Sequence, residues 1–249
     1  MVFREYGNKN DKVVVLLHGG GLAGWGYESV AQKLSEKYHI ILPDIDGHGD
    51  SDRDFISIEN NAQHILEYIN NYHDGKVFAI GGLSLGGQIT LEILSQKADI
   101  CEYAFIESAL VVPSKFTEIM VKPLLDCSYF LINKPWFAKM QFDYLKIDKT
   151  LFEHYYRDSC KITKNNMISF LKANTTYRLK QSLNKTKAKV IVLAGGKEQK
   201  NIIRSSHLIA DKIPESCIEI IPELYHGQLS MNFSERYISI FNKYIKQTK

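Results

Sequence analysis

The sequence predicts an α/β fold, with a doubly wound, mostly parallel sheet and a helical segment inserted between two of its strands. Three observations support this prediction. Six short apolar runs have the character of buried strands, segments with helical periodicity alternate with them, and residues 113–188 contain no convincing strand. Near-continuous apolar character is typical of parallel strands covered on both faces. Strand–helix alternation favours right-handed crossovers between parallel strands.

The predicted strands are separated by intervals long enough for a helix. They are Val13–Leu17, His39–Leu42, Lys76–Ile80, Tyr103–Ile106, Lys189–Leu193 and Cys217–Ile221. Val2–Tyr6 is a weaker extended run that would add an edge strand. Apolar stripes of helical period begin at Tyr27, Ile58, Leu85 and Phe233, and these predict the covering helices.

Residues 113–188 break the alternation. They hold 12 of the 28 aromatic residues, and no glycine occurs between positions 88 and 194. A structureless loop of this length is improbable in a compact domain, so we expect several short helices folded over one edge of the sheet. We therefore divide the chain into a core, 1–112 and 189–249, and a helical insertion, 113–188.

The composition is that of an ordinary globular chain. Of 249 residues, 45% are apolar and 24% are charged, and the net charge is +3. This balance excludes a disordered or fibrous chain and gives no reason to expect a nucleic acid partner. No apolar run approaches the roughly 20 residues that cross a bilayer, and the first residues lack the apolar stretch of a secretory signal. We expect a cytoplasmic protein without a membrane span.

The four cysteines are far apart and form no CxxC pair. No histidine stands at ligand spacing from them, so they indicate neither a zinc site nor a disulfide framework. We expect reduced, buried thiols, no metal and no cofactor. The residues are Cys101, Cys127, Cys160 and Cys217.

A glycine-flanked serine stands between a predicted strand and a predicted helix, in Gly82-Leu83-Ser84-Leu85-Gly86-Gly87. Glycines two residues before and after the serine are needed because a Cβ there would collide with the strand and the helix. The helix N-terminus favours developing negative charge near the hydroxyl. The alternatives are an exposed serine in a plain turn and a phosphate loop, which no Lys-Ser or Lys-Thr closes. We predict that Ser84 is a nucleophile.

A serine hydroxyl needs a base, and the base needs an acid that orients it. His226 follows the last predicted strand, at the rim where sheets of this kind bind ligands. Glu198 follows the strand Lys189–Leu193 in a loop with two glycines, and Glu107 at an earlier strand end is its rival. We favour Glu198 because such a loop can place a long side chain behind an imidazole.

A second glycine cluster, His18-Gly19-Gly20-Gly21, follows the strand Val13–Leu17. Acyl transfer develops negative charge on a carbonyl oxygen, and the site must meet it with N–H donors. The amides of Gly20 and Leu85 would form this oxyanion hole, with Gly21 as the alternative to Gly20. We expect His18 to hold the loop by hydrogen bonding rather than to transfer protons.

Together these motifs resemble the α/β-hydrolase superfamily over essentially the whole chain. The resemblance implies Ser84 as nucleophile, His226 as base and Glu198 as acid, in the superfamily's chain order. It also implies a structural role for the turn Pro43–Ser51 and a helical cap inserted after the sixth strand. The departure is Glu198, because the usual acid of the family is aspartate.

The leading hypothesis is a serine carboxylesterase that acts on esters of small or medium apolar acyl groups through an acyl-enzyme intermediate. The aromatic insertion motivates this small-molecule substrate, and Trp136, Phe137, Phe142 or Tyr144 are candidates to line the pocket. One alternative is a carbon–carbon bond hydrolase or lyase, disfavoured because the insertion has few arginines to hold a carboxylate. Another is a non-catalytic binding protein on a hydrolase scaffold.

Overall fold

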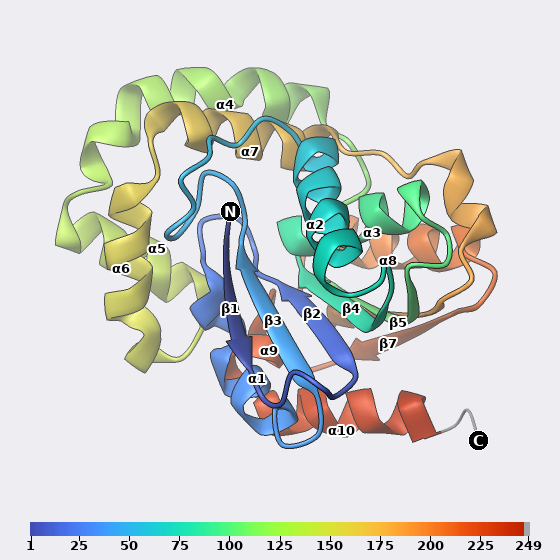
Figure 1. Cartoon of the computed structure of the whole chain (residues 1–249). Helices are drawn as coiled ribbons and strands as arrows, with labels where there is room; N and C mark the ends of the chain where they lie inside the picture. The colour runs from blue at the N-terminus through green and yellow to red at the C-terminus, as the bar shows by residue number, and fades with distance from the viewer. Residues whose placement is uncertain (247–249) are drawn as a thin grey trace.

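The computed structural model describes residues 1–246, which contain one seven-stranded sheet with helices on both faces (Figure 1). The strand order is β1-β3-β2-β4-β5-β6-β7, and β1 alone runs antiparallel to its neighbour within these residues. The strands are β1 (Val2–Tyr6), β2 (Val13–Leu17), β3 (His39–Asp44), β4 (Val77–Leu83), β5 (Cys101–Glu107), β6 (Lys189–Gly195) and β7 (Ser216–Ile221).

Both faces of the sheet are buried, because alternate residues of each strand point to opposite cores. Val15 and Leu17 of β2 pack into the core beneath α2 and α3. Val14 and Leu16 pack into the core beneath α1 and α10. This explains the near-continuous apolar runs of the sequence. The helices on the first face are α2 (Ile58–Tyr72), α3 (Leu85–Gln96) and α8 (Lys200–Lys212), and those on the second are α1 (Glu28–Leu34), α9 (Gln228–Asn232) and α10 (Ser234–Lys246) (Figure 1).

The helices of residues 115–176 lie outside the sheet, at the end where the parallel strands finish, and residues 177–188 return past α3 to the start of β6 (Figure 1). Ser114 and Thr163 cap the first and last of the α-helices through their hydroxyl groups, which accept backbone N–H groups at 3.2 Å. Helix α4 packs against α7, and α5 packs against α6. The elements are α4 (Lys115–Ser128), η2 (Tyr129–Leu131), α5 (Pro135–Leu145), η3 (Lys149–Leu151), α6 (Phe152–Lys161), α7 (Lys164–Thr176) and η4 (Gln181–Lys185).

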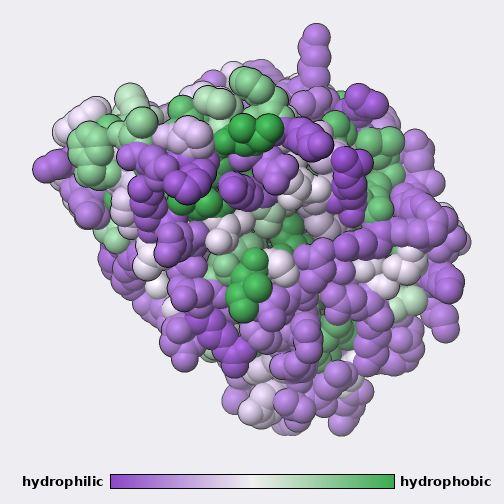
Figure 2. All heavy atoms as spheres, turned by 90° about the horizontal axis from the view of Figure 1, so that it is seen from above, coloured by the Kyte–Doolittle hydropathy of each residue, from purple (hydrophilic) through white to green (hydrophobic). Residues whose placement is uncertain are grey.

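The outer surface of this helical segment carries several large apolar side chains. Figure 2 looks down on the side that carries α4 and α7, and apolar side chains interrupt the hydrophilic surface there. Seven large apolar side chains of α4, η2 and α5 are exposed: Phe116, Ile119, Leu124, Phe130, Trp136, Met140 and Tyr144. Several aromatic residues of the segment therefore face outward rather than toward the sheet.

The predicted fold class is confirmed. All six predicted strands form, several of them one to three residues longer, and Val2–Tyr6 is the antiparallel edge strand β1. The helical segment follows the fifth strand in chain order, β5, and not the sixth that the resemblance implies. The segment follows the fifth strand because only one strand, β1, precedes β2 within residues 1–246.

Two other expectations have definite outcomes. All four cysteines are free thiols, but only Cys101 is buried, and Cys127 on α4 is exposed, so uniform burial was wrong. None of the helices in the described part of the chain has the length and apolarity to cross a membrane.

Candidate active site

Ser84 stands on a sharp turn between β4 and α3. Its backbone is in the left-handed region, with φ 52° and ψ −109°, which costs energy for a residue with a side chain. A Cβ on Gly82 would lie 2.2 Å from the carbonyl carbon of Gly86, and a Cβ on Gly86 would lie 2.2 Å from the carbonyl oxygen of Leu17. The two glycines are therefore required by the space available, as the sequence predicted.

The side chains of His226 and Glu198 contact each other close to this turn. The Nδ1 atom of His226 lies 2.7 Å from Glu198 Oε2, and the Glu198 side chain has no solvent exposure while the His226 side chain is 41% exposed. A carboxylate can only accept, so Nδ1 carries the proton and Nε2 is left as the basic nitrogen. The carboxylate thus fixes the tautomer that a general base requires.

Two further donors hold Glu198. The Ser108 hydroxyl donates to Oε1 over 2.6 Å, and the Gly195 amide donates to the same oxygen over 2.8 Å. Ser108 directly follows β5, has φ 56°, and is buried. Sequence reasoning missed this residue, because a serine beside Glu107 carries no motif of its own.

The four polar residues lie at the ends of neighbouring parallel strands. Ser84 follows β4, Ser108 follows β5, Glu198 follows β6 and His226 follows β7. Ligands bind at this carboxyl edge in open α/β sheets, because loops from successive strands converge there. The strand order alone brings together residues separated by more than a hundred positions.

Glu107, the rival acid, makes no hydrogen bond to His226 among the described residues. Its Oε1 accepts the Ser230 amide over 3.3 Å, and its Oε2 lacks a hydrogen-bond partner among the described residues. Burial raises the pKa of Glu107 to about 7. Glu198 is the carboxylate that contacts His226, as the sequence favoured.

The first glycine cluster forms a loop beside Ser84. The Ile45 amide donates to His18 Nε2 over 2.9 Å, so Nδ1–H donates to the Gly19 carbonyl at 2.8 Å. Burial lowers the pKa of His18, which keeps the ring neutral. These contacts give His18 the loop-holding role that the sequence predicted.

Gly20 and Leu85, whose amides the sequence predicts as oxyanion donors, lie close to Ser84. Gly20 lines the same cavity as Ser84, and Leu85 is the first residue of α3. Amides in the first turn of a helix have no acceptor within the helix, which leaves them available to a ligand. A Cβ on Gly20 would lie 3.0 Å from the ring of Phe170, so α7 closes tightly over this loop.

The turn Pro43–Ser51 is structural. Asp44 is fully buried and accepts the amides of Gly24 at 2.8 Å and Asp50 at 3.0 Å. Arg4 donates to the same carboxylate over 2.6 Å. These bonds hold the turn against β1 and the loop after β2, and they leave Asp44 without a free oxygen for catalysis.

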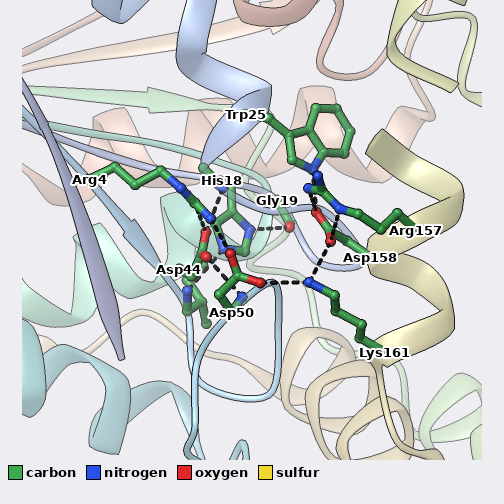
Figure 3. A network of polar contacts seen from close by, with 11 residues as sticks. Arg4, His18, Gly19, Trp25, Asp44, Asp50, Arg157, Asp158 and Lys161 are labelled. Atoms are coloured by element: carbon green, nitrogen blue, oxygen red, sulfur yellow. Dashed lines mark hydrogen bonds and ion pairs between the residues drawn. The ribbon is translucent and has the colours of Figure 1, made fainter. Parts of the chain in front are cut away.

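A charged network ties the helical segment to the core beside the first glycine loop (Figure 3). Asp158 of α6 is buried and accepts the indole N–H of Trp25 over 2.9 Å. Lys161 lies 2.6 Å from Asp50, which also binds Arg4 at 2.7 Å. The network therefore runs from α6 to β1 and fixes how the segment sits over the site.

Two cavities open on Ser84 and His226. The inner one, of about 190 Å³, has an apolar lining apart from the Ser84, His226 and Tyr155 side chains. Its lining residues are Gly19, Gly20, Gly21, Leu22, Leu83, Ser84, Leu145, Ile147, Tyr155, His226, Gly227 and Met231. The outer one, of about 410 Å³, is more polar and is lined by Ser84, Leu110, Tyr144, Leu145, Lys146, Asn174, Lys197, Glu198, Gln199, Ile202, Tyr225 and His226.

The aromatic residues expected in the pocket lie mostly elsewhere. Tyr144 lines the outer cavity, but Trp136 is 62% exposed and Phe142 is buried against Phe152 and Tyr155. Neither those two nor Phe137 lines either cavity at Ser84. Composition showed that the segment is aromatic, but helix orientation decides which rings face the site.

A serine at a strained strand-to-helix turn, with an oriented imidazole at the same sheet edge, defines the hydrolase class of this fold. The family model described as "Serine aminopeptidase, S33" matches residues 8–230, and the chain belongs to this family of α/β hydrolases. An AB hydrolase superfamily protein from Gibberella zeae is 28% identical over 123 residues. That match spans 48% of this chain and less than half of the relative, 43%.

Solved structures share the fold over nearly the whole chain. An esterase from Exiguobacterium antarcticum superimposes with a TM-score of 0.82 at 20% identity, covering 98% of this chain and 94% of that one. A thermophilic esterase from Thermogutta terrifontis gives a TM-score of 0.80 at 16% identity, covering 99% and 93%. At these identities the likeness shows the fold alone.

Proposed function

We propose that this hydrolase is a serine carboxylesterase that cleaves esters of small or medium apolar acyl groups. The observation that carries the proposal is the 2.7 Å contact between His226 Nδ1 and Glu198 Oε2 beside the strained Ser84 turn. This contact leaves the His226 Nε2 atom basic, within a cavity that Ser84 also lines. The esterases that share the fold support the same reading by analogy.

The reaction follows from these positions. Ser84 Oγ attacks the ester carbonyl while His226 Nε2 takes its proton, and Glu198 stabilises the imidazolium that forms. The amides of Gly20 and Leu85 donate to the carbonyl oxygen as it becomes negative. His226 then returns the proton to the departing alcohol. Water attacks the acyl-Ser84 ester by the same route and releases the acid.

The inner cavity suits the acyl group. It contains the Gly19–Gly21 loop, which carries a proposed oxyanion donor, and its walls are formed by side chains such as Leu22, Ile147 and Met231. Burying apolar surface there stabilises the bound substrate by roughly 25 cal/mol per Å². A volume of about 190 Å³ suits an acyl group of small or medium size.

The test is hydrolysis of p-nitrophenyl esters graded by acyl length, with a fluorophosphonate probe that labels activated serines. The Ser84→Ala variant should lose turnover and labelling, whereas Ser29→Ala, an exposed serine on α1, should keep both. Undiminished turnover in Ser84→Ala would overturn the proposal. So would a wild-type protein that neither hydrolyses these esters nor reacts with the probe.

A further inference from the structure

The outer cavity differs from the inner one in charge. Two lysines, Lys146 from the end of α5 and Lys197 from the loop after β6, line the outer cavity and neither lines the inner one. Both ammonium groups lie over the ring of Tyr225, at 3.5 Å and 5.3 Å from its centroid. Tyr225 directly precedes His226, so two positive charges flank the base.

Hydrogen bonds fix the main chain at both lysines. The Lys197 amide donates to the Leu224 carbonyl over 3.0 Å. The Lys146 carbonyl accepts the side-chain amides of Gln228 at 2.6 Å and Asn232 at 3.1 Å, while Lys146 itself has φ 57°. A non-glycine residue keeps such a conformation only where its surroundings determine it. Both lysines are thus tied to the segment that carries His226.

Neither ammonium of this pair forms an ion pair within residues 1–246, whereas other lysines of the helical segment do, as Lys122 does with Asp126. Glu198 lines the same cavity, but its side chain is unexposed and its oxygens are bound by Ser108, Gly195 and His226. Glu223 forms its ion pair with Arg236, which lowers the pKa of that carboxyl most, and Lys197 contributes to the same shift. Lys146, by hydrogen bonding and charge, and Lys197, by charge, lower the pKa of Tyr225.

From this arrangement we infer that the outer cavity binds a carboxylate on the alcohol portion of the substrate. The inference rests on the proposed function and names its substrate class: apolar acyl esters of hydroxy acids. The acyl group occupies the inner cavity, so the departing oxygen lies at His226 and the rest of the alcohol extends toward Lys146 and Lys197. The two ammonium groups attract the carboxylate and orient it.

The experiment compares two esters that differ in one charge, 3-butyryloxybenzoate and its neutral methyl ester. The double variant Lys146→Gln/Lys197→Gln should lower kcat/KM for the anionic ester by about tenfold, because both lysines are exposed and each ion pair at an exposed lysine is weak. It should change kcat/KM for the neutral ester by less than about twofold. Salt near 1 M, where the screening length is about 3 Å, should reduce the wild-type value for the anionic ester toward that of the double variant.

The matched control is Lys149→Gln, an exposed lysine three residues from Lys146 that lines neither cavity. It should leave both esters unchanged. Equal losses for the two esters in the double variant, or an unchanged ratio between them, would overturn the inference while leaving the esterase proposal intact. Failure of the wild type on both esters would count against the esterase itself.

Binding of 3-hydroxybenzoate, the alcohol portion released from 3-butyryloxybenzoate, tests the carboxylate site without turnover. Calorimetry on Ser84→Ala should detect this product, and adding Lys146→Gln/Lys197→Gln should weaken its binding about tenfold. Binding that does not depend on the two lysines would overturn the inference, whatever the activity.

Discussion

The Ser108 hydroxyl donates a hydrogen bond to Glu198 Oε1 over 2.6 Å, and the other oxygen of the same carboxylate accepts from His226. Ser108 follows β5 and Glu198 follows β6, so the bond connects two adjacent strand ends across the sheet edge. In the proposed mechanism this bond makes Ser108 a positioning residue, because Ser108 acts on His226 only through the Glu198 carboxylate. A hydrogen bond to a charged, buried acceptor contributes roughly 1.5–3 kcal/mol.

Ser108→Ala should reduce kcat by about tenfold with little change in KM, because the carboxylate loses a donor while the substrate cavities keep their linings. Ser108→Gly offers a matched comparison, since it removes the same hydroxyl and also relieves the strain of φ 56°. Both variants should lose the same activity, whereas Gly should melt at a higher temperature than Ala. An unchanged kcat in both would show that Ser108 does not position Glu198.

Substitution of Glu198 and substitution of Glu107 should have different effects on activity. Glu198→Gln should lower kcat by about a thousandfold or more, because an amide can present its N–H to Nδ1 and favour the wrong tautomer. Glu107→Gln should keep most of the activity, because Glu107 contacts Ser230 rather than His226. Steady-state kinetics on a p-nitrophenyl ester distinguishes the two. The reverse pattern would assign the acid to Glu107.

Glu107 should also make stability depend on pH. Burial raises its pKa from 4.5 to about 7, so the folded state holds a proton that the unfolded state releases over this range. The contribution of Glu107 to the free energy of unfolding is therefore fully present below about pH 4.5. It is lost as the pH rises to about 7, and the loss amounts to up to ~3 kcal/mol. Urea titrations should show a flatter profile for Glu107→Gln. Glu102→Gln, exposed on the same strand, should leave the wild-type slope unchanged.

Gly86→Ala should destabilise the fold by on the order of 3 kcal/mol, because the new Cβ meets backbone atoms that cannot move aside. The nearest, the Leu17 carbonyl oxygen, would lie 2.2 Å away. Gly26→Ala is the control, since its Cβ would approach only Met231 Cε, at 3.8 Å. Thermal melting compares the two variants. Equal melting temperatures for Gly86→Ala and Gly26→Ala would show that the turn can rearrange.

The sequence predicted most of the sheet, and the physical reason is burial. A strand such as β2 is covered on both faces, so its composition is apolar throughout and is visible locally. Ser84, Glu198 and His226 were likewise predictable as neighbours, because each follows a parallel strand and glycines mark the turns. Their catalytic roles stay proposals.

Contacts between distant segments could not be predicted in the same way. Ser108 and the Lys146–Tyr225 contact depend on side-chain directions after strands and helices have packed. The exposure of Trp136 and the burial of Phe142 depend on how α5 is rotated, and its alternation of polar and apolar residues is weak. These features depend on tertiary packing, which the local periodicity of the sequence does not reveal.

The bond between Trp25 and Asp158 should control how firmly the helical segment is held over the site. The Trp25 ring is 7% exposed and lies between the first glycine loop and α6, so its environment reports on this contact (Figure 3). Asp158→Ala leaves a buried indole N–H without its acceptor, a loss of roughly 1–3 kcal/mol. It also leaves the Arg157 guanidinium without its carboxylate partner, whereas Lys161 keeps its ion pair with Asp50.

In a Trp136→Phe background, Trp25 is the one remaining tryptophan, and Asp158→Ala should shift its fluorescence to longer wavelength as water reaches the ring. Proteases should cut residues 113–188 faster, because local opening depends on the contacts that close the segment. Asp143→Ala removes an exposed carboxylate on α5 that pairs with Lys139, and it should change neither signal. An unshifted Trp25 spectrum in Asp158→Ala would mean that apolar packing, rather than this bond, holds α6 against the core.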